Sequence, residues 1–229
     1  MNLKVIAFDA DDTLFVNEPY FQETEQKFCA LMSDYLSHQG LSQELFKTEI
    51  DNLALYGYGI KAYILSMIEA AMKISNNTIS IETIEKILEY GKELLQRPIE
   101  LLDGVEETLK ALHGNYKLVV ATKGDLKDQR RKLHDSGLGN YFHHIEVMSD
   151  KQEKDYTDLL HRLEIKPEEF FMIGNSLKSD VLPVLAIGSY AVHIPFHTTW
   201  EHEKISHKVE HPNFRTLEKI SDVLPLLIK

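Results

Sequence analysis

Short apolar segments rich in valine and isoleucine recur along the chain, and each is followed by a stretch with helical spacing. Strands that are apolar throughout are buried on both faces, which is typical of a parallel sheet covered by helices. From Val105 onward strand and helix alternate regularly, and Gly137 ends a helix expected at about 126–136. The pattern predicts an α/β fold with a doubly wound, Rossmann-like parallel sheet. Its expected strands are residues 3–8, 117–122, 145–148, 170–173 and 190–194.

The segment between the first expected strand and Val105 breaks this alternation, because it reads as helix after helix with no strand between them. The expected helices are residues 21–38, 45–55, 60–72 and 81–95, separated by Gly40, Gly57-Tyr58-Gly59 and Asn76-Asn77. The chain would return to the sheet near Pro98 and Asp103-Gly104. We therefore expect an α-helical domain at residues 16–98, inserted into an α/β core domain formed by residues 1–15 and 99–229.

Composition narrows the functional classes. Lys and Arg number 25 against 36 Asp and Glu, and the net charge of −11 disfavours binding to nucleic acid or to an anionic membrane surface. The apolar run 5–8 stops at Asp9 before it could form a secretion signal, and no run approaches the roughly 18 residues of a membrane span. Cys29 is the single cysteine, which predicts a buried thiol and a reducing compartment. We expect a cytoplasmic protein; the oligomeric state carries no sequence signal.

The sequence Asp9-Ala10-Asp11-Asp12-Thr13 follows the first expected strand. It would lie at the carboxyl edge of a parallel sheet, where open α/β folds bind their ligands. Three carboxylates in four positions repel one another, and a protein keeps them mainly where a cation or a reacting group offsets the charge. An acidic turn or a helix cap would explain the same residues. The other strand ends decide between this structural interpretation and a ligand site.

Each of the other strand ends carries polar residues suited to a phosphoryl site. In Thr122-Lys123-Gly124, a hydroxyl and a glycine-adjacent backbone can donate hydrogen bonds to phosphate oxygens. The ammonium of Lys151 could balance the charge of both a nucleophile and a phosphate. After the fourth strand, Gly174-Asn175-Ser176 and Asp180 supply oxygen ligands for a hard cation. Four strand ends are therefore expected to converge on one edge.

This ordered set of motifs, with a helical insert after the first, resembles the haloacid dehalogenase superfamily from about residue 3 to residue 194. The resemblance implies that Asp9 attacks phosphorus to form an aspartyl-phosphate. Asp11 would first protonate the leaving oxygen and then activate the hydrolytic water. Thr122 and Lys151 would hold the transferring phosphoryl group.

The resemblance also implies a Mg²⁺ ion, held by the Asp9 carboxylate, the backbone carbonyl of Asp11, and Asn175 or Asp180. Phosphatases of the family often carry Gly-Asp where this chain has Gly174-Asn175, so a neutral amide replaces an anionic ligand. Asp180 would then carry more of the metal binding.

The lysine motif is ambiguous, because Lys154 lies only three residues beyond Lys151. Lys151 is preferred, since it directly follows the strand end and Tyr156 has the spacing of the family's usual aromatic residue.

The function implied is a magnesium-dependent phosphohydrolase acting on a small phosphorylated metabolite, with a helical cap that closes over the sheet edge. Lys123, Gly124 and the cap residues Tyr58 and Lys61 are the further candidates for substrate binding.

Several other functions stay open. A 2-haloacid dehalogenase characteristically lacks the second aspartate, which is present here as Asp11. A phosphomutase would pass the phosphoryl group to a sugar hydroxyl, and a phosphonatase would need a cap lysine such as Lys61. Asn175 also motivates a catalytically idle protein that binds phosphate ligands or a partner.

Overall fold

The computed structural model describes residues 2–228, which divide into two compact units. One unit, here the α/β unit, runs up to Glu18 and resumes at Ile99; the other, the helical unit, spans Pro19–Pro98. Each unit has hydrophobic cores of its own.

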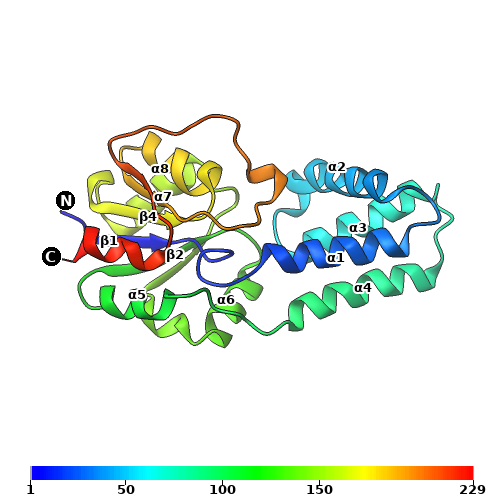
Figure 1. Cartoon of the computed structure of the whole chain (residues 1–229), viewed down its shortest axis with the longest axis horizontal. Coiled ribbons are helices and arrows are strands. Elements are labelled where there is room, and N and C mark those ends of the chain that lie inside the picture. Colours follow the sequence, from blue (N-terminus) through cyan, green and yellow to red (C-terminus); the bar gives the residue numbers. More distant parts are fainter. Residues whose placement is uncertain (1, 229) are drawn as a thin grey trace. The chain divides into compact units, whose positions relative to one another are not determined.

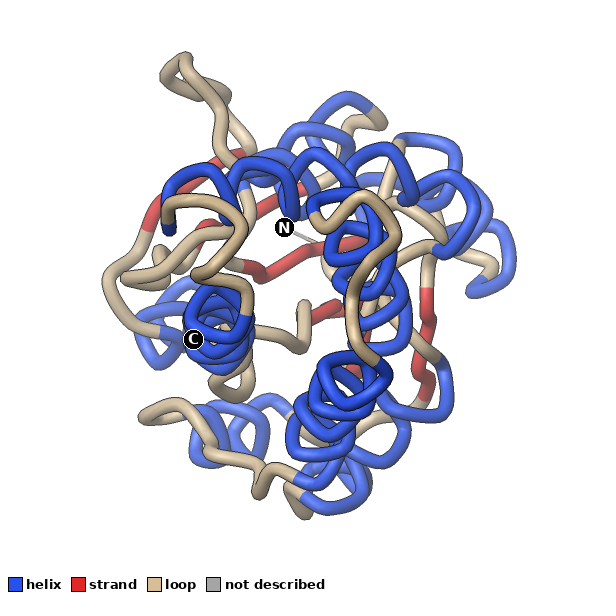
Figure 2. Tube along the Cα trace, turned by 90° about the vertical axis from the view of Figure 1, so that its right-hand side faces the viewer, coloured by secondary structure: helices blue, strands red, loops and turns tan. Residues whose placement is uncertain are grey.

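The α/β unit is built on a six-stranded sheet with the order β3-β2-β1-β4-β5-β6, in which every neighbouring pair is parallel. Figures 1 and 2 show helices around the strands of this unit. The strand order reverses direction at β1, which lies between β2 and β4, and ligands bind outside the carboxyl ends of strands at such a switch point. The prediction of a doubly wound α/β fold is confirmed. The strands are β1 Val5–Phe8, β2 Lys117–Thr122, β3 His144–Val147, β4 Phe170–Gly174, β5 Tyr190–His193 and β6 Phe214–Thr216.

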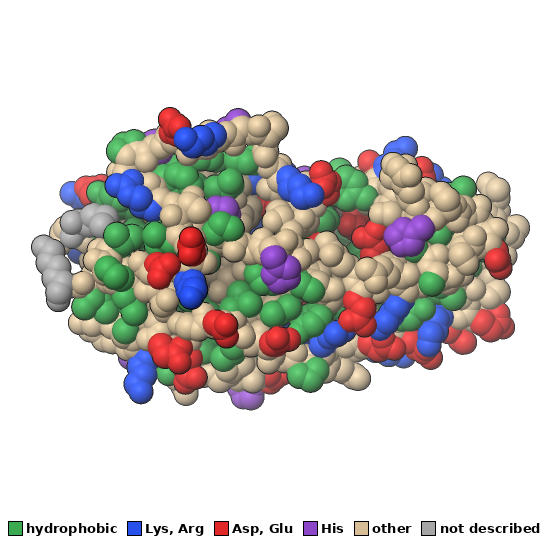
Figure 3. All heavy atoms as spheres, in the orientation of Figure 1, with side chains coloured by type: hydrophobic (Ala, Val, Ile, Leu, Met, Phe, Trp, Pro, Cys, Tyr) green, Lys and Arg blue, Asp and Glu red, His purple; other side chains and the backbone are tan. Residues whose placement is uncertain are grey.

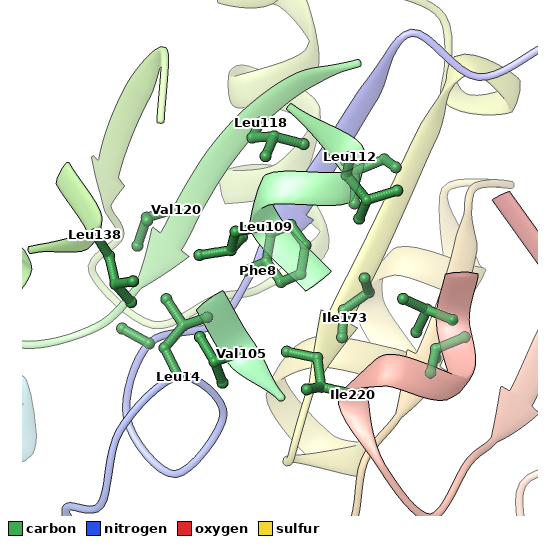
Figure 4. Packing of buried hydrophobic residues seen from close by; sticks show 14 of the residues in the cluster. Phe8, Leu14, Val105, Leu109, Leu112, Leu118, Val120, Leu138, Ile173 and Ile220 are labelled. Atoms are coloured by element: carbon green, nitrogen blue, oxygen red, sulfur yellow. The ribbon is translucent and has the colours of Figure 1, made fainter. Parts of the chain in front are cut away.

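The central strands are apolar throughout because successive residues face two different cores. Ile6 and Phe8 contribute to one hydrophobic cluster, whereas Val5 and Ala7 contribute to the other. Helices α5 Val105–Leu112, α6 Leu126–Asp135 and α9 Leu224–Leu227 supply the first cluster, part of which is shown in Figure 4. Helices α7 Glu153–Leu163 and α8 Leu182–Ala186 supply the second. Both faces of the sheet are therefore covered.

The expected strand 117–122 matches β2, and the other four expected strands overlap observed ones with small shifts at their ends. Strand β6 is absent from the sequence prediction. It has three residues, of which two are exposed, so it has no apolar run that could identify it.

The helical unit contains α1 Glu18–Leu31, α2 His38–Tyr56, α3 Ile60–Ile74 and α4 Ile81–Gln96. Its core is made of buried apolar side chains, including Phe28, Met67 and Ile87. Gly91 of α4 lets that helix approach α3, because a Cβ at this position would lie 2.7 Å from Cγ1 of Ile64. Cys29 is buried, and burial raises the pKa of its thiol to about 11. Its predicted burial is thus confirmed.

The predicted boundary between the first two helices is wrong. Helix α1 ends at Leu31, and Gly40 lies in the first turn of α2 and not between the helices. The true start of α2 is set by Ser37, whose Oγ accepts a hydrogen bond from the backbone N–H of Gly40 at 3.3 Å. The expected breaks at Gly57–Gly59 and Asn76-Asn77 do separate helices, and Gly57, Gly59, Asn76 and Asn77 have positive φ angles.

No helix within residues 2–228 is long and apolar enough to cross a membrane. Acidic and basic side chains are interspersed over the face of the molecule shown in Figure 3.

Candidate active site

A buried lysine connects two buried aspartates at the carboxyl edge of the sheet. The Nζ of Lys151 donates to Oδ1 of Asp9 at 2.5 Å and to Oδ1 of Asp180 at 2.6 Å. The side chain of Lys151 is only 2% exposed. Because a buried charge is costly unless it is paired, one ammonium between two carboxylates makes each of the three groups tolerable to the fold.

Burial and neighbouring charges change the pKa values of the groups in this cluster. Burial raises the pKa of Asp9 to about 7; the ammonium of Lys151 opposes this effect, and the carboxylates of Asp180 and Asp11 reinforce it. Burial lowers the pKa of Lys151, but Asp180 and Asp9 outweigh it and hold that pKa well above its usual value. Lys151 is therefore a cation at neutral pH, and further positive charge near Asp9 would favour its ionised form.

The structure places Lys151, and not Lys154, against Asp9. The Lys154 side chain is 86% exposed and pairs with Asp158 on α7. Lys151 has a positive φ of 54°, a conformation that is unfavourable for a non-glycine residue and is often retained at functional sites. Tyr156 is buried beside this segment and donates its hydroxyl to the backbone carbonyl of Ser179 at 2.9 Å.

Asp180 reaches the cluster because the chain after β4 folds back on itself. A π-helical turn, Leu177–Val181, returns the carboxylate toward the strand end, where its Oδ2 accepts from the backbone N–H of Ser176 at 3.0 Å. Gly174 makes this possible, since a Cβ there would lie 2.2 Å from the same Asp180 oxygen. Glycine is thus a steric requirement at position 174.

Asn175 lies close to Asp9 through Thr13. The Thr13 hydroxyl is 3.1 Å from Oδ2 of Asp9 and 3.4 Å from Oδ1 of Asn175. The oxygens of a carboxylate and of an amide therefore face the same hydroxyl group.

The oxygen donors at this edge fit a hard divalent cation. Among residues 2–228, no group of three or more His, Cys, Asp and Glu side chains is arranged to hold a metal. A cation would accordingly be held by the Asp9 carboxylate, the amide oxygen of Asn175 or the Asp180 carboxylate, and a backbone carbonyl such as that of Asp11.

Asp11 is held from helix α6. Its Oδ2 accepts from Nε2 of Gln129 at 2.8 Å, and its Oδ1 forms an ion pair with Lys132. Sequence reasoning missed both partners. The available signal was a polar pair with i, i+3 spacing on a helix that directly follows the Thr122 strand end.

The carboxylate of Asp12 has a structural role. It accepts hydrogen bonds from the backbone N–H groups of Asn17 at 2.8 Å and of Glu18 at 3.0 Å, at the start of α1. The acidic-turn explanation therefore applies to this aspartate.

The residues at the end of β2 differ in their surroundings. Thr122 is buried at the strand end, and Gly124 has a φ of 111°. The ammonium of Lys123 donates to Oγ of Ser179 at 3.1 Å and forms an ion pair with Glu203, so it is engaged within the protein.

Glu203 is a further acid that sequence reasoning missed, and its side chain is only 12% exposed. Its carboxylate also accepts from the hydroxyls of Ser176 and Ser179. Burial opposes ionisation of Glu203, but Lys123 and the two hydroxyls outweigh it and lower its pKa to about 2. The segment carrying Glu203 is thereby fixed to the loops after β2 and β4.

Tyr58 and Lys61 belong to the helical unit, at the junction of α2 and α3. Tyr58 is half-buried and Lys61 is exposed. Their assignment to substrate binding stays a prediction.

Comparison with known proteins shows that the chain is a hydrolase. The family described as haloacid dehalogenase-like hydrolase matches residues 3–188, and the chain belongs to that family. No curated protein matches the chain significantly. The resemblance inferred from the motifs is confirmed.

Solved structures of the same fold include proteins with different activities. A haloacid dehalogenase-like family hydrolase from Xanthomonas campestris is 37% identical, with a TM-score of 0.87 over 98% of this chain and 90% of that one. A predicted phosphoglycolate phosphatase from Haemophilus somnus is 18% identical, with a TM-score of 0.64 over 99% and 98%. L-2-haloacid dehalogenase from Xanthobacter autotrophicus is 11% identical, with a TM-score of 0.67 over 99% and 100%. The last two likenesses show the fold alone.

Proposed function

We propose that this hydrolase is a magnesium-dependent phosphohydrolase, which acts on a small phosphorylated metabolite through an aspartyl-phosphate on Asp9. The observation that carries the proposal is the buried Lys151, which bridges Asp9 and Asp180. A dianionic phosphoryl group needs a fixed cation beside the nucleophile, and Lys151 is held there with its charge intact.

In the first half-reaction, a carboxylate oxygen of Asp9 attacks phosphorus as the ester P–O bond breaks. The carboxylic acid form of Asp11 transfers its proton to the leaving oxygen, so an alcohol departs. Thr122 and Lys151 hold the oxygens of the transferring group, and Lys123 and Gly124 line the same strand end.

In the second half-reaction, the Asp11 carboxylate takes a proton from water as the water oxygen attacks phosphorus. The bond between phosphorus and Asp9 breaks, which regenerates the Asp9 carboxylate and releases inorganic phosphate. Asp11 then carries the proton that the next leaving oxygen needs, so the cycle balances.

A bound Mg²⁺ would supply positive charge to Asp9 and to the phosphoryl oxygens. Asp9, the backbone carbonyl of Asp11, and Asn175 or Asp180 would hold it. We propose that residues 16–98 form a cap that excludes water, with Tyr58 and Lys61 contacting the substrate, and that the protein acts in the cytoplasm.

The retained Asp11 favours phosphoryl transfer over dehalogenation, since its carboxylate is held in place by two partners from α6. Asn175 motivates a second candidate, an idle protein that binds phosphate. Magnesium binding without any hydrolysis, in both the wild type and Asn175→Asp, would support that candidate.

The deciding experiment is hydrolysis of 4-nitrophenyl phosphate and a panel of phosphorylated metabolites, with Mg²⁺ and after chelation. Asp9→Asn should abolish turnover, whereas Asp158→Asn, which changes a partly exposed aspartate on α7, should match the wild type. Turnover that persists in Asp9→Asn or without metal would refute the proposal. Phosphoryl transfer to a sugar hydroxyl in place of water would redirect it to a phosphomutase.

A further inference from the structure

Helix α6 contacts both oxygens of the Asp11 side chain. Gln129 donates to one oxygen at 2.8 Å, and Lys132 forms an ion pair with the other. The Asp11 side chain is 26% exposed, so the helix fixes its orientation without enclosing it. The two α6 residues are three apart, which puts them on one face of the helix.

Lys132 is fixed by more than its ion pair. Its Nζ is 3.3 Å from Oδ1 of Asn17 and lies 5.3 Å from the centre of the Phe15 ring. The residue is 6% exposed. A lysine this deeply buried has lost its hydration. Among the described residues, Asp11 is the one acidic side chain that forms an ion pair with it.

Gln129 links two of the strand-end loops. Its Nε2 donates to Asp11 and also to the backbone carbonyl of Lys123, both at 2.8 Å. Because both partners are acceptors, the orientation of the amide is determined. Gly124 allows this approach, since a Cβ there would lie 3.1 Å from the same nitrogen.

The Gln129 amide is satisfied on its nitrogen and unsatisfied on its oxygen. The residue is 2% exposed, and its Oε1 has no hydrogen-bond partner within the described part of the chain. An unsatisfied buried acceptor is unfavourable, and an apolar side chain would avoid it. Leu133 already anchors α6 in the hydrophobic core. The contacts that Gln129 and Lys132 share are those to the two carboxylate oxygens of Asp11.

We propose that Gln129 and Lys132 are positioning residues that orient the Asp11 carboxyl group for proton transfer to the leaving oxygen. The inference rests on the proposed phosphohydrolase function and adds to it two residues outside the four motifs. Asp11 remains the group that gives and takes the proton; Gln129 and Lys132 act through it.

The need for a proton from Asp11 depends on the leaving group. A poor leaving group must receive a proton as the P–O bond breaks, whereas a stable phenolate can depart without one. Phenyl phosphate and 4-nitrophenyl phosphate have nearly the same shape, but phenol, with a pKa of about 10, is the weaker acid. Misplacement of Asp11 should therefore impair phenyl phosphate more.

The test measures kcat/KM for both esters, because this ratio reports the step in which the leaving group departs. Lys132→Met and Gln129→Met should lose about tenfold more on phenyl phosphate than on 4-nitrophenyl phosphate. Asp11→Asn should show the same bias more strongly, and Lys132→Arg should recover part of the loss. Lys127→Met, which removes an exposed lysine of the same helix, should match the wild type on both esters.

Equal losses on the two esters, or no loss in either variant, would overturn the inference while the proposed function stands. Thermal unfolding of each variant identifies a folding defect. If Lys132→Met fails to fold, Lys132→Arg replaces it in the comparison of the two esters. A wild type without any Asp9-dependent hydrolysis would overturn the proposed function and this inference with it.

Discussion

The helical unit and the α/β unit bury different kinds of side chain. Within residues 19–98, all of which are described, the buried polar side chains are the uncharged Thr24, Thr48, Ser66 and Ser75. The α/β unit buries Asp9, Asp12, Asp128, Lys132, Lys151, Glu169 and Asp180. Since a buried charge costs stability unless it is paired, the α/β unit accepts a cost that the helical unit avoids. Four of these charges, on Asp9, Lys132, Lys151 and Asp180, meet at the carboxyl edge of the sheet.

Removal of the Lys151 ammonium group should have the largest effect on stability and on activity. Lys151→Met would leave Asp9 and Asp180 buried without a counter-charge, and we expect a loss of about 3 to 5 kcal/mol in the free energy of unfolding. We also expect kcat to fall by about 10³-fold. Lys154→Met is the matched control, because that lysine is exposed. Urea unfolding and turnover should separate the two variants; similar behaviour would contradict the assignment of Lys151.

Two glycine substitutions test whether tight packing serves different ends in the two units. Gly174→Ala should displace the Asp180 carboxylate, because the new Cβ would lie 2.2 Å from it, and should weaken Mg²⁺ binding by about 10- to 100-fold. Gly91→Ala should crowd Ile64 and cost about 1 to 3 kcal/mol of stability. Isothermal titration with Mg²⁺ distinguishes them. Loss of metal affinity in Gly91→Ala alone would break the comparison.

Glu203 provides a pH test of its largely buried ion pair with Lys123. The folded-state pKa of about 2 lies below the ordinary 4.5, so its stabilisation is fully present above pH 4.5 and is lost as the pH falls toward 2. Glu203→Gln should cost about 2 to 3 kcal/mol at pH 7 and should flatten the dependence of stability on pH between 4.5 and 2. Unfolding measured across that range checks the sign. An unchanged slope would refute the ion pair.

The smallest effect is expected in the helical unit. Lys73 of α3 and Glu44 of α2 form an ion pair at 2.8 Å, with side chains that are largely exposed to solvent. Lys73→Met should change stability by less than about 1 kcal/mol, and salt should reduce the difference further. Urea unfolding at low and high salt measures it. A loss comparable to that of Lys151→Met would show that the two units do not differ in this respect.

Local patterns predicted most of the fold. Short segments rich in apolar residues identified five of the strands, since a parallel sheet covered by helices buries most of its strand residues. Strand β6 was missed because two of its three residues are exposed. The boundary between α1 and α2 was misplaced because the Ser37 cap, and not the nearby Gly40, sets the start of α2.

Long-range pairing explains what was missed at the site. The motif residues lie next to strand ends, and a parallel sheet brings its strand ends to one edge whatever the remaining side chains are. Gln129, Lys132 and Glu203 carry no such mark. Lys132 pairs with a residue 121 positions away, and Glu203 with one 80 positions away.

By itself, the sequence determined the alternation of strand and helix, the helical insertion and the position of Asp9 at a strand end, because these depend on residue spacing and burial over short stretches. The sequence favoured Lys151 over Lys154, but only the tertiary structure decided that Lys151 bridges Asp9 and Asp180, that Gly174 makes room for Asp180, and that α6 holds Asp11. The physical reason is that charge pairing and close packing depend on distances between segments, and those distances are set only when the chain has folded.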